Sequence, residues 1–169
     1  MHWRVLCAAL LVAPLTPVAT AQALEARCEK MLPQQALNAA VGAGFKAHDA
    51  TERKPGELEC SWLSRGSGSI KTLFVGHKSK AGLVSWGNNF TPAKNANDWW
   101  DMVVTNTEEA LKAKRQMIPG VGKRAALVAM PAGGQSKLFI QRDDDVIEMV
   151  VMGVSNADVT KVAKALGSP

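Results

Sequence analysis

The sequence predicts an α+β fold, in which an antiparallel sheet of about six strands carries three helices on one face. Two observations favour it. Short segments with alternating apolar and polar residues recur between turns rich in glycine, proline, serine or aspartate, which is typical of antiparallel strands. Three longer segments repeat apolar residues with a helical period. The order helix–strand–strand–strand occurs twice, which favours two α-β-β-β halves followed by a closing helix.

The start of the chain has the pattern of a secretory signal peptide. Arg4 supplies a positive charge, the apolar run VLCAALLVAPL is too short to span a bilayer, and small residues offer a cleavage site after Ala21 or Ala23. The alternative is a buried N-terminal helix. We expect a signal peptide over residues 1–21, a single α+β domain over residues 22–169, and a periplasmic or secreted product without a membrane-spanning segment.

The first half of the domain predicts one helix and three strands. The helix covers residues 32–44, with Pro33 in its first turn and Gly42 or Gly44 at its end. Its apolar stripe consists of Leu37, Ala40 and Val41. The strands are expected at residues 45–52, 58–64 and 70–78, with turns at 53–57 and 65–69.

The second half opens with a long stretch without a clear pattern, residues 79–96, which we expect to be functional or ordered by its own side chains. A helix follows at residues 98–114, with Asn97 or Asp98 as its N-cap. The buried stripe of this helix is expected to contain Trp100, Val103, Val104, Thr107 and Leu111.

Three strands and a helix complete the second half. The strands are predicted at residues 125–130, 136–142 and 146–153, joined by turns that contain PAGGQ and DDD. The closing helix covers residues 155–167, and Ser155 or Asn156 is its expected cap. Its apolar stripe consists of Val159, Val162, Ala163 and Leu166.

Cysteine usage agrees with export. Cys7 lies within the signal segment, which leaves Cys28 and Cys60 as a pair that an oxidising compartment would join in a disulfide. In a strand, Cys60 shares its face with apolar side chains, where a disulfide is favoured over a reactive thiolate. The alternative is a thiol nucleophile or a pair of metal ligands.

The arrangement resembles small exported cell-envelope proteins of unknown function, best known as actinobacterial lipoproteins. The resemblance covers most of the domain and depends on short, individually common motifs. They comprise Cys28, Leu32, Gly42, Cys60, Trp62, Ile118, Pro119, Gly120, Gly122, Ala125 and the segment 163–166. The chain lacks a lipidation cysteine, so anchoring does not carry over. The resemblance implies a disulfide-linked α+β domain at the cell envelope and implies no chemistry.

Few residues point to catalysis, a metal or a cofactor. His48 and His77 are the histidines outside the signal segment, and no G-x-S-x-G motif accompanies them. His48 and Asp49 would face opposite sides of a strand, which disfavours a metal site. An enzyme, either a small hydrolase or a metal-dependent one, that uses His48 or His77 with nearby carboxylates is therefore the alternative function. We expect no cofactor and no metal.

Three further motifs have simpler structural interpretations. The run from Asp143 to Asp145 lacks the spacing of a calcium loop and predicts a turn. The segment GVGKR, residues 120–124, has the wrong spacing for a phosphate-binding loop, so it also predicts a turn. Met149 and Met152 lie in a strand pattern and are expected in the core rather than as metal ligands.

An aromatic patch is the remaining candidate site. If Trp100 occupies the buried stripe, then Trp99 and Met102 move to the flank of the helix, beside Trp86 and Phe90 of the preceding loop. The alternative is that the loop packs down on the helix as a satellite cluster. Tryptophan is enriched in binding surfaces, and Lys112, Lys114, Arg115, Lys123 and Arg124 could form a basic rim.

The formal net charge is +5, which an ordinary solvated surface explains without a special partner. We therefore expect an exported, non-enzymatic envelope binding domain of the inhibitor, immunity or accessory type. Its partner would be an envelope protein or a glycan, bound through Trp86, Phe90, Trp99, Met102, Lys112 and Arg115. The expected compartment disfavours nucleic acid as a partner.

Overall fold

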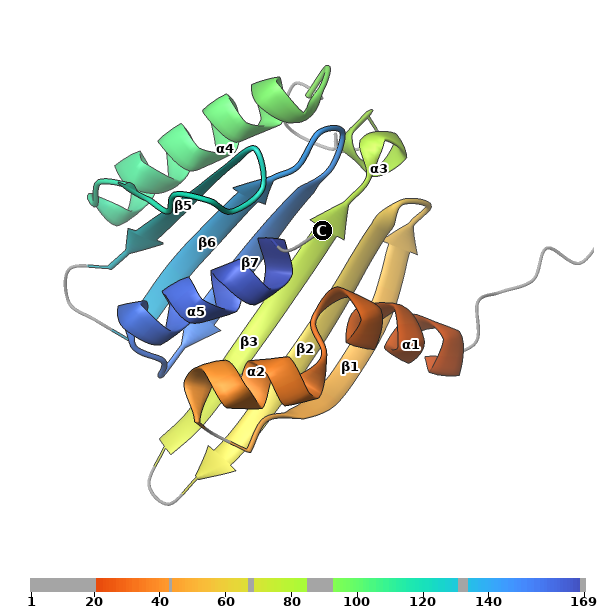
Figure 1. Cartoon of the computed structure of the whole chain (residues 1–169). Helices are drawn as coiled ribbons and strands as arrows, with labels where there is room; N and C mark the ends of the chain where they lie inside the picture. The colour runs from red at the N-terminus through yellow and green to blue at the C-terminus, as the bar shows by residue number, and fades with distance from the viewer. Residues whose placement is uncertain (1–20, 43, 67–68, 85–92, 131–133, 168–169) are drawn as a thin grey trace, which may run out of the picture.

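The computed structural model describes residues 21–42, 44–66, 69–84, 93–130 and 134–167 (Figure 1). The helices are α1 (Ala21–Met31), α2 (Gln34–Val41), α3 (Lys80–Val84), α4 (Ala96–Leu111) and α5 (Asn156–Gly167). The strands are β1 (Lys46–Lys54), β2 (Glu57–Gly66), β3 (Ser69–Lys78), β4 (Gln116–Met117), β5 (Arg124–Ala129), β6 (Gln135–Gln141) and β7 (Val146–Met152). Residues 1–20, which hold most of the predicted signal peptide, lie outside the described residues.

The strands form one antiparallel sheet in the order β1-β2-β3-β7-β6-β5-β4. The predicted α+β class is confirmed, but the described residues form seven strands and five helices, more than predicted. The extra strand, β4, has only two residues, too few for alternation to reveal it. The two helices beyond the predicted three are α1 and α3. α1 falls between the predicted signal peptide and the predicted helix at 32–44, and α3 has only five residues.

Three helices cover one face of the sheet. Figure 1 shows α1, α2 and α5 together in front of the strands. Their apolar side chains join alternate residues of the strands in one core, which includes Leu37, Trp62, Leu73, Leu138, Met149 and Val162. The predicted closing helix is confirmed: the whole stripe of α5 is buried, and Ser155 Oγ accepts a hydrogen bond from the Asp158 amide at its first turn.

The fourth long helix covers the opposite face. α4 packs on Ala126, Val128 and Phe139, whose neighbours Leu127 and Leu138 point into the core under α5. The expectation that all helices share one face is therefore wrong. β5 is buried on both faces, so its sequence lacks the alternation that would assign it a single covered face.

The element order repeats, but the packing does not. β1-β2-β3 and β5-β6-β7 are two meanders that meet at the antiparallel pair β3 and β7. A two-fold axis that relates one meander to the other would pass between β3 and β7 at right angles to the sheet. Rotation about this axis would leave each helix on the same face of the sheet. Because α2 and α4 lie on opposite faces, two α-β-β-β halves related by that axis are ruled out.

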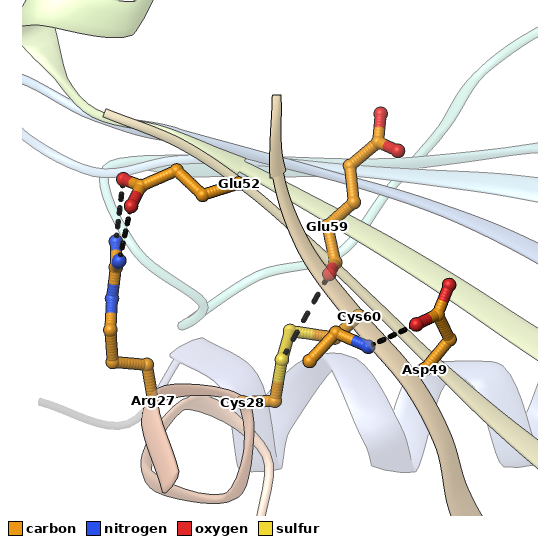
Figure 2. Close-up of a disulfide and its surroundings, with 7 residues drawn as sticks. Arg27, Cys28, Asp49, Glu52, Glu59 and Cys60 are labelled. Carbon is orange, nitrogen blue, oxygen red and sulfur yellow. Dashed lines mark hydrogen bonds and ion pairs between the residues drawn. A yellow bond between two sulfur atoms is a disulfide. The ribbon is translucent and has the colours of Figure 1, made fainter. Parts of the chain in front are cut away.

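A disulfide ties α1 to the sheet. Cys28 of α1 and Cys60 of β2 are bonded, with Cα atoms 5.8 Å apart and a sequence separation of 32, which confirms the predicted pairing. Figure 2 shows Arg27 beside this bond, donating to both oxygens of Glu52 on β1 at 2.8 and 3.1 Å. Hydrogen bonding to Arg27 lowers the pKa of Glu52 below its ordinary value.

α4 begins earlier than expected. Asn95 is its N-cap, and the Asn95 Oδ1 accepts from the amides of Asn97 and Asp98 at 2.8 and 3.0 Å. The predicted cap, Asn97 or Asp98, therefore lies inside the first turn. The helix ends where Lys112 adopts a left-handed conformation at φ 49°. Among the described residues, each helix is too short or too polar to cross a bilayer.

Candidate functional site: the uncovered part of the sheet

Within the part of the chain that the structure describes, the sheet face under α4 is covered only in part. α4 lies over β5 and β6, while the same face of β1, β2, β3 and β7 holds three of the four large apolar side chains that are exposed in the described residues. They are Ile70 at 66% exposure, Phe74 at 46% and Met152 at 37%. We call this face of β1, β2, β3 and β7 the open face.

Strand register orders the open face into rows. One row runs Asp49, Ser61, Phe74, Val150 and Lys137 across five strands. The next row runs Thr51, Glu59, Gly76, Glu148 and Phe139. Directly opposed residues on one face of a sheet are in side-chain contact range. The two rows therefore place apolar and charged side chains next to each other.

A cleft of about 430 Å³ lies on these rows. Its lining combines the exposed ring of Phe74 and the side chain of Val150 with ionisable groups from four strands. The ionisable groups are Asp49, Arg53, Glu57, Glu59, Lys78 and Glu148. A concave surface with an apolar wall and a few convergent polar groups is the usual form of a binding site.

Ion pairs organise the cleft. Glu57 and Lys78 form a buried pair at one end, where α3 and the turn between β1 and β2 meet. The close contact between α3 and this turn requires glycine, since a Cβ on Gly82 would lie 2.4 Å from the Gly56 carbonyl oxygen. Arg53 contacts Glu59 at 2.8 Å, with exposed side chains.

The other two carboxylates of the cleft differ. Glu148 contacts Lys137 at 3.2 Å on the side of α4. Asp49 accepts a hydrogen bond from the amide of Ala50 at 2.9 Å and has no cationic partner among the described residues.

A smaller apolar hollow adjoins the open face. It measures about 220 Å³ and lies between the flank of α4 and Lys137. Met102, Asn106 and Ala110 are among its α4 residues. Met102, predicted as a partner-binding residue on the helix flank, is half-buried and lines this hollow.

The predicted role of Trp99 is wrong. Both neighbouring tryptophans of α4 are buried, Trp99 at 0% exposure and Trp100 at 1%. Trp99 meets Phe139 edge to face at 6.1 Å, and the Arg124 guanidinium lies 4.8 Å from the centre of the Trp100 ring. Leu83 of α3, Ala93 and the sheet residues Ala126, Val128 and Phe139 belong to the same buried cluster as both rings. Trp86 and Phe90, the other predicted aromatic residues, lie outside the described residues.

The predicted basic rim is divided between the two ends of α4. Lys123 and Arg124 lie at the start of the helix, where Arg124 pairs with Asp101 at 3.1 Å. Lys112, Lys114 and Arg115 follow its end, about 24 Å away for a helix of 16 residues.

Arg115 is bound within the protein. Its guanidinium pairs with Glu108 and its backbone amide donates to the same carboxylate, contacts that lower the pKa of Glu108. Lys112 is the exposed C-cap of α4. The structure therefore places Lys112 and Arg115 at the far end of α4 from Trp99.

The two histidines lie apart. His48 is exposed at a bulge of β1, in a shallow hollow with Lys46 and Arg65. His77 lies on the face of the sheet that α1, α2 and α5 cover, and its Nε2 is 2.8 Å from Oδ2 of Asp145. Asp145 ends the predicted acidic turn, in which the Arg142 amide donates to the Asp145 carbonyl at 3.0 Å.

The glycine-rich segment GVGKR and the two methionines are the remaining sequence motifs. In GVGKR, residues 120–123 form a turn with positive φ at Gly120 and Gly122, and Arg124 begins β5. Met149 is in the core as predicted, but Met152 is exposed on the open face, which corrects the prediction for it. No group of three or more histidine, cysteine, aspartate or glutamate residues that could hold a metal ion occurs in the described part of the chain.

Sequence reasoning missed Phe74 and Gly76. A signal for Phe74 exists, because β2 alternates Glu57, Glu59 and Ser61 against an apolar face. Pairing β3 with β2 puts Phe74 on the polar side of that alternation. That pairing register comes from the folded structure.

The comparisons with known proteins give no relative: no family model, curated protein or solved structure matches this chain.

Proposed function

We propose that this chain is an exported, non-enzymatic binding domain of the cell envelope, and that a partner protein docks on the open face. The observation that carries the proposal is the exposed strip of Ile70, Phe74 and Met152 beside the cleft. Exposed apolar side chains grouped on one face and rimmed by charges mark interaction sites. Two of the three residues of the strip, Ile70 and Met152, are not aromatic, which favours a protein surface over a glycan.

Export is supported by the leader pattern and the disulfide. Disulfides persist in oxidising compartments, and the Cys28–Cys60 bond joins the α1 helix to the core. The test is intact mass measurement of the protein from cells lysed in a thiol-trapping reagent. We expect a chain starting at Gln22 or Leu24 with no trapped thiol. A full-length chain with both thiols trapped would overturn the export proposal.

The docking site is tested by photo-crosslinking in the producing cells. A photoreactive phenylalanine analogue replaces Phe74 in one variant and Gln35, exposed on α2, in the control. We expect a discrete adduct from position 74 and none from position 35, and we expect Phe74→Asp to prevent capture of the crosslinked protein. Equal adducts at both positions, or capture unaffected by Phe74→Asp, would contradict docking on the open face.

A second candidate function is supported by the His77–Asp145 pair. A carboxylate that orients a histidine is part of the machinery of many hydrolases. Such a hydrolase also needs a nucleophile, and in the described residues no serine, threonine or cysteine side chain is hydrogen-bonded to His77. An activity screen that compares the protein with its His48→Ala/His77→Ala variant separates the two functions, because turnover lost in the variant would favour an enzyme.

A further inference from the structure

Gly76 occupies a position that does not require glycine. It lies in the middle of β3, between two paired strands, and its φ is not in the left-handed region. A Cβ built there would meet only the Glu148 carbonyl oxygen, at an ordinary distance of 3.8 Å. Glycine inside a strand weakens the strand, and it often marks a place where a ligand approaches the backbone closely.

The missing side chain opens the centre of the cleft. Glu59 and Glu148 are the direct neighbours of Gly76 on the two adjacent strands and point to the same face. Their Cα atoms are therefore about 10 Å apart, two strand spacings. That gap admits one flat or compact group between two carboxylates, with the Gly76 backbone as its floor.

The charges around this gap favour a cation. The lining holds four carboxylates, Asp49, Glu57, Glu59 and Glu148, against two basic side chains, Arg53 and Lys78. The whole chain has the opposite sign, with a net charge of +5. Lys137 reaches Glu148 from the side of α4, and Arg53 pairs with Glu59 through exposed side chains. An exposed pair such as Arg53–Glu59 contributes little, so an incoming cation can replace Arg53 there; the Lys137–Glu148 pair is half-buried.

The wall of the cleft suits the stem of a long basic side chain. Phe74 and Val150 form the next row beside Gly76 and Glu148. Arginine and lysine bury their methylene stems on apolar surfaces and keep the charge at the tip, and a guanidinium also stacks on an aromatic ring. The half-exposed ring of Phe74 offers such a surface.

We propose that the cleft binds an arginine or lysine side chain of the partner, with its cationic group above Gly76 between Glu59 and Glu148. This inference rests on the proposed function and adds the chemistry that the docked partner presents. Asp49, which has no cationic partner among the described residues, adds attraction at the rim. A charged pocket beside an apolar strip gives both orientation and a faster association rate.

The test is a titration of the processed protein with acetyl-tetra-arginine amide, followed by the amide NMR signal of Gly76. Acetyl-tetra-citrulline amide, which has nearly the same shape and no charge, is the control ligand. We expect a saturable shift with the arginine peptide, at least about tenfold weaker binding of the citrulline peptide, and weaker binding as salt increases. Glu59→Gln with Glu148→Gln should weaken binding by about tenfold as well.

Gly76→Val separates the site from the fold. The valine fills the gap and suits a strand, so we expect loss of binding with a melting temperature unchanged or raised by about 2–4 °C. Gly66→Val, at the end of β2 and outside the cleft lining, is the matched control and should bind normally.

Three results would overturn the inference: equal binding of both peptides, normal binding by Gly76→Val, or no shift at Gly76. If the crosslinked adduct forms at position 74 while one of these results is obtained, the docking proposal stands and the inference of a bound cationic side chain is wrong. If the adduct is also absent, both proposals fail.

Discussion

Trp99 and Trp100 show how two adjacent large side chains are both buried on one helix. Helical neighbours point about 100° apart, so a flat contact with the sheet can enclose only one of them fully. Trp100 lies against Arg124 of β5, and Trp99 packs against Phe139 of β6, so both rings contact the sheet. The additional cover comes from α3 and the segment at Ala93, which belong to the same core.

Trp99 is therefore expected to stabilise the fold rather than to bind a partner. Trp99→Ala should lower the free energy of unfolding by about 3–5 kcal/mol because it leaves a large cavity. Phe74→Ala, on the open face, should lower it by less than about 1 kcal/mol. Urea unfolding followed by circular dichroism measures both. Similar losses in the two variants would show that Phe74 is also part of the core.

The buried pair of Glu57 and Lys78 gives a second prediction for single residues. Lys78→Met leaves the Glu57 carboxylate buried without its cation and should cost about 3–5 kcal/mol of stability. Adding Glu57→Leu removes that uncompensated charge, so the double variant should recover most of the loss. The measurement is the free energy of unfolding of the three proteins, and a double variant that is less stable than Lys78→Met would refute the argument.

Among the elements, α1 is the one that depends most on covalent attachment. It buries Leu24 and Cys28, presents exposed residues on its other sides, and is held by the disulfide and the Arg27–Glu52 pair. Removing the bond by Cys28→Ser/Cys60→Ser should cost about 3–4 kcal/mol in the chain-entropy model for a loop of this length. Denaturant unfolding of this variant and of the oxidised protein gives the difference; equal stability would mean that packing alone holds α1.

For the whole molecule, the ion pairs predict lower stability in acid. Contacts with Arg27, Arg115 and Lys161 lower the pKa of their partners Glu52, Glu108 and Asp158 in the folded protein. The unfolded chain therefore binds more protons as the pH falls, and the stability that these carboxylates contribute at neutral pH is lost.

Thermal melts from pH 7 downward should show this loss between about pH 5 and pH 2. Arg27→Gln with Glu52→Gln removes one pair and should make the loss smaller. A melting temperature that stays constant or rises through this range would contradict the sign of these pKa shifts.

The sequence by itself determined most of the elements and their local geometry. Alternation located β2, apolar segments between turns located β3, β6 and β7, and the helical stripe located α5. Turn-forming residues located the breaks between strands, and the two cysteines outside the predicted signal peptide indicated the Cys28–Cys60 bond. These features depend on residues close together in sequence, or on two cysteines that can pair in only one way. One sequence is therefore enough to predict them.

Only the tertiary structure decided which face of the sheet each helix covers and where the open face lies. β5 is apolar on both sides, so its pattern allowed α4 on either face. The pairing of β3 with β7 joins residues 68 to 80 positions apart, and it alone places Glu148 and Val150 beside Gly76 and Phe74. Such contacts depend on packing between distant segments, which no local periodicity encodes.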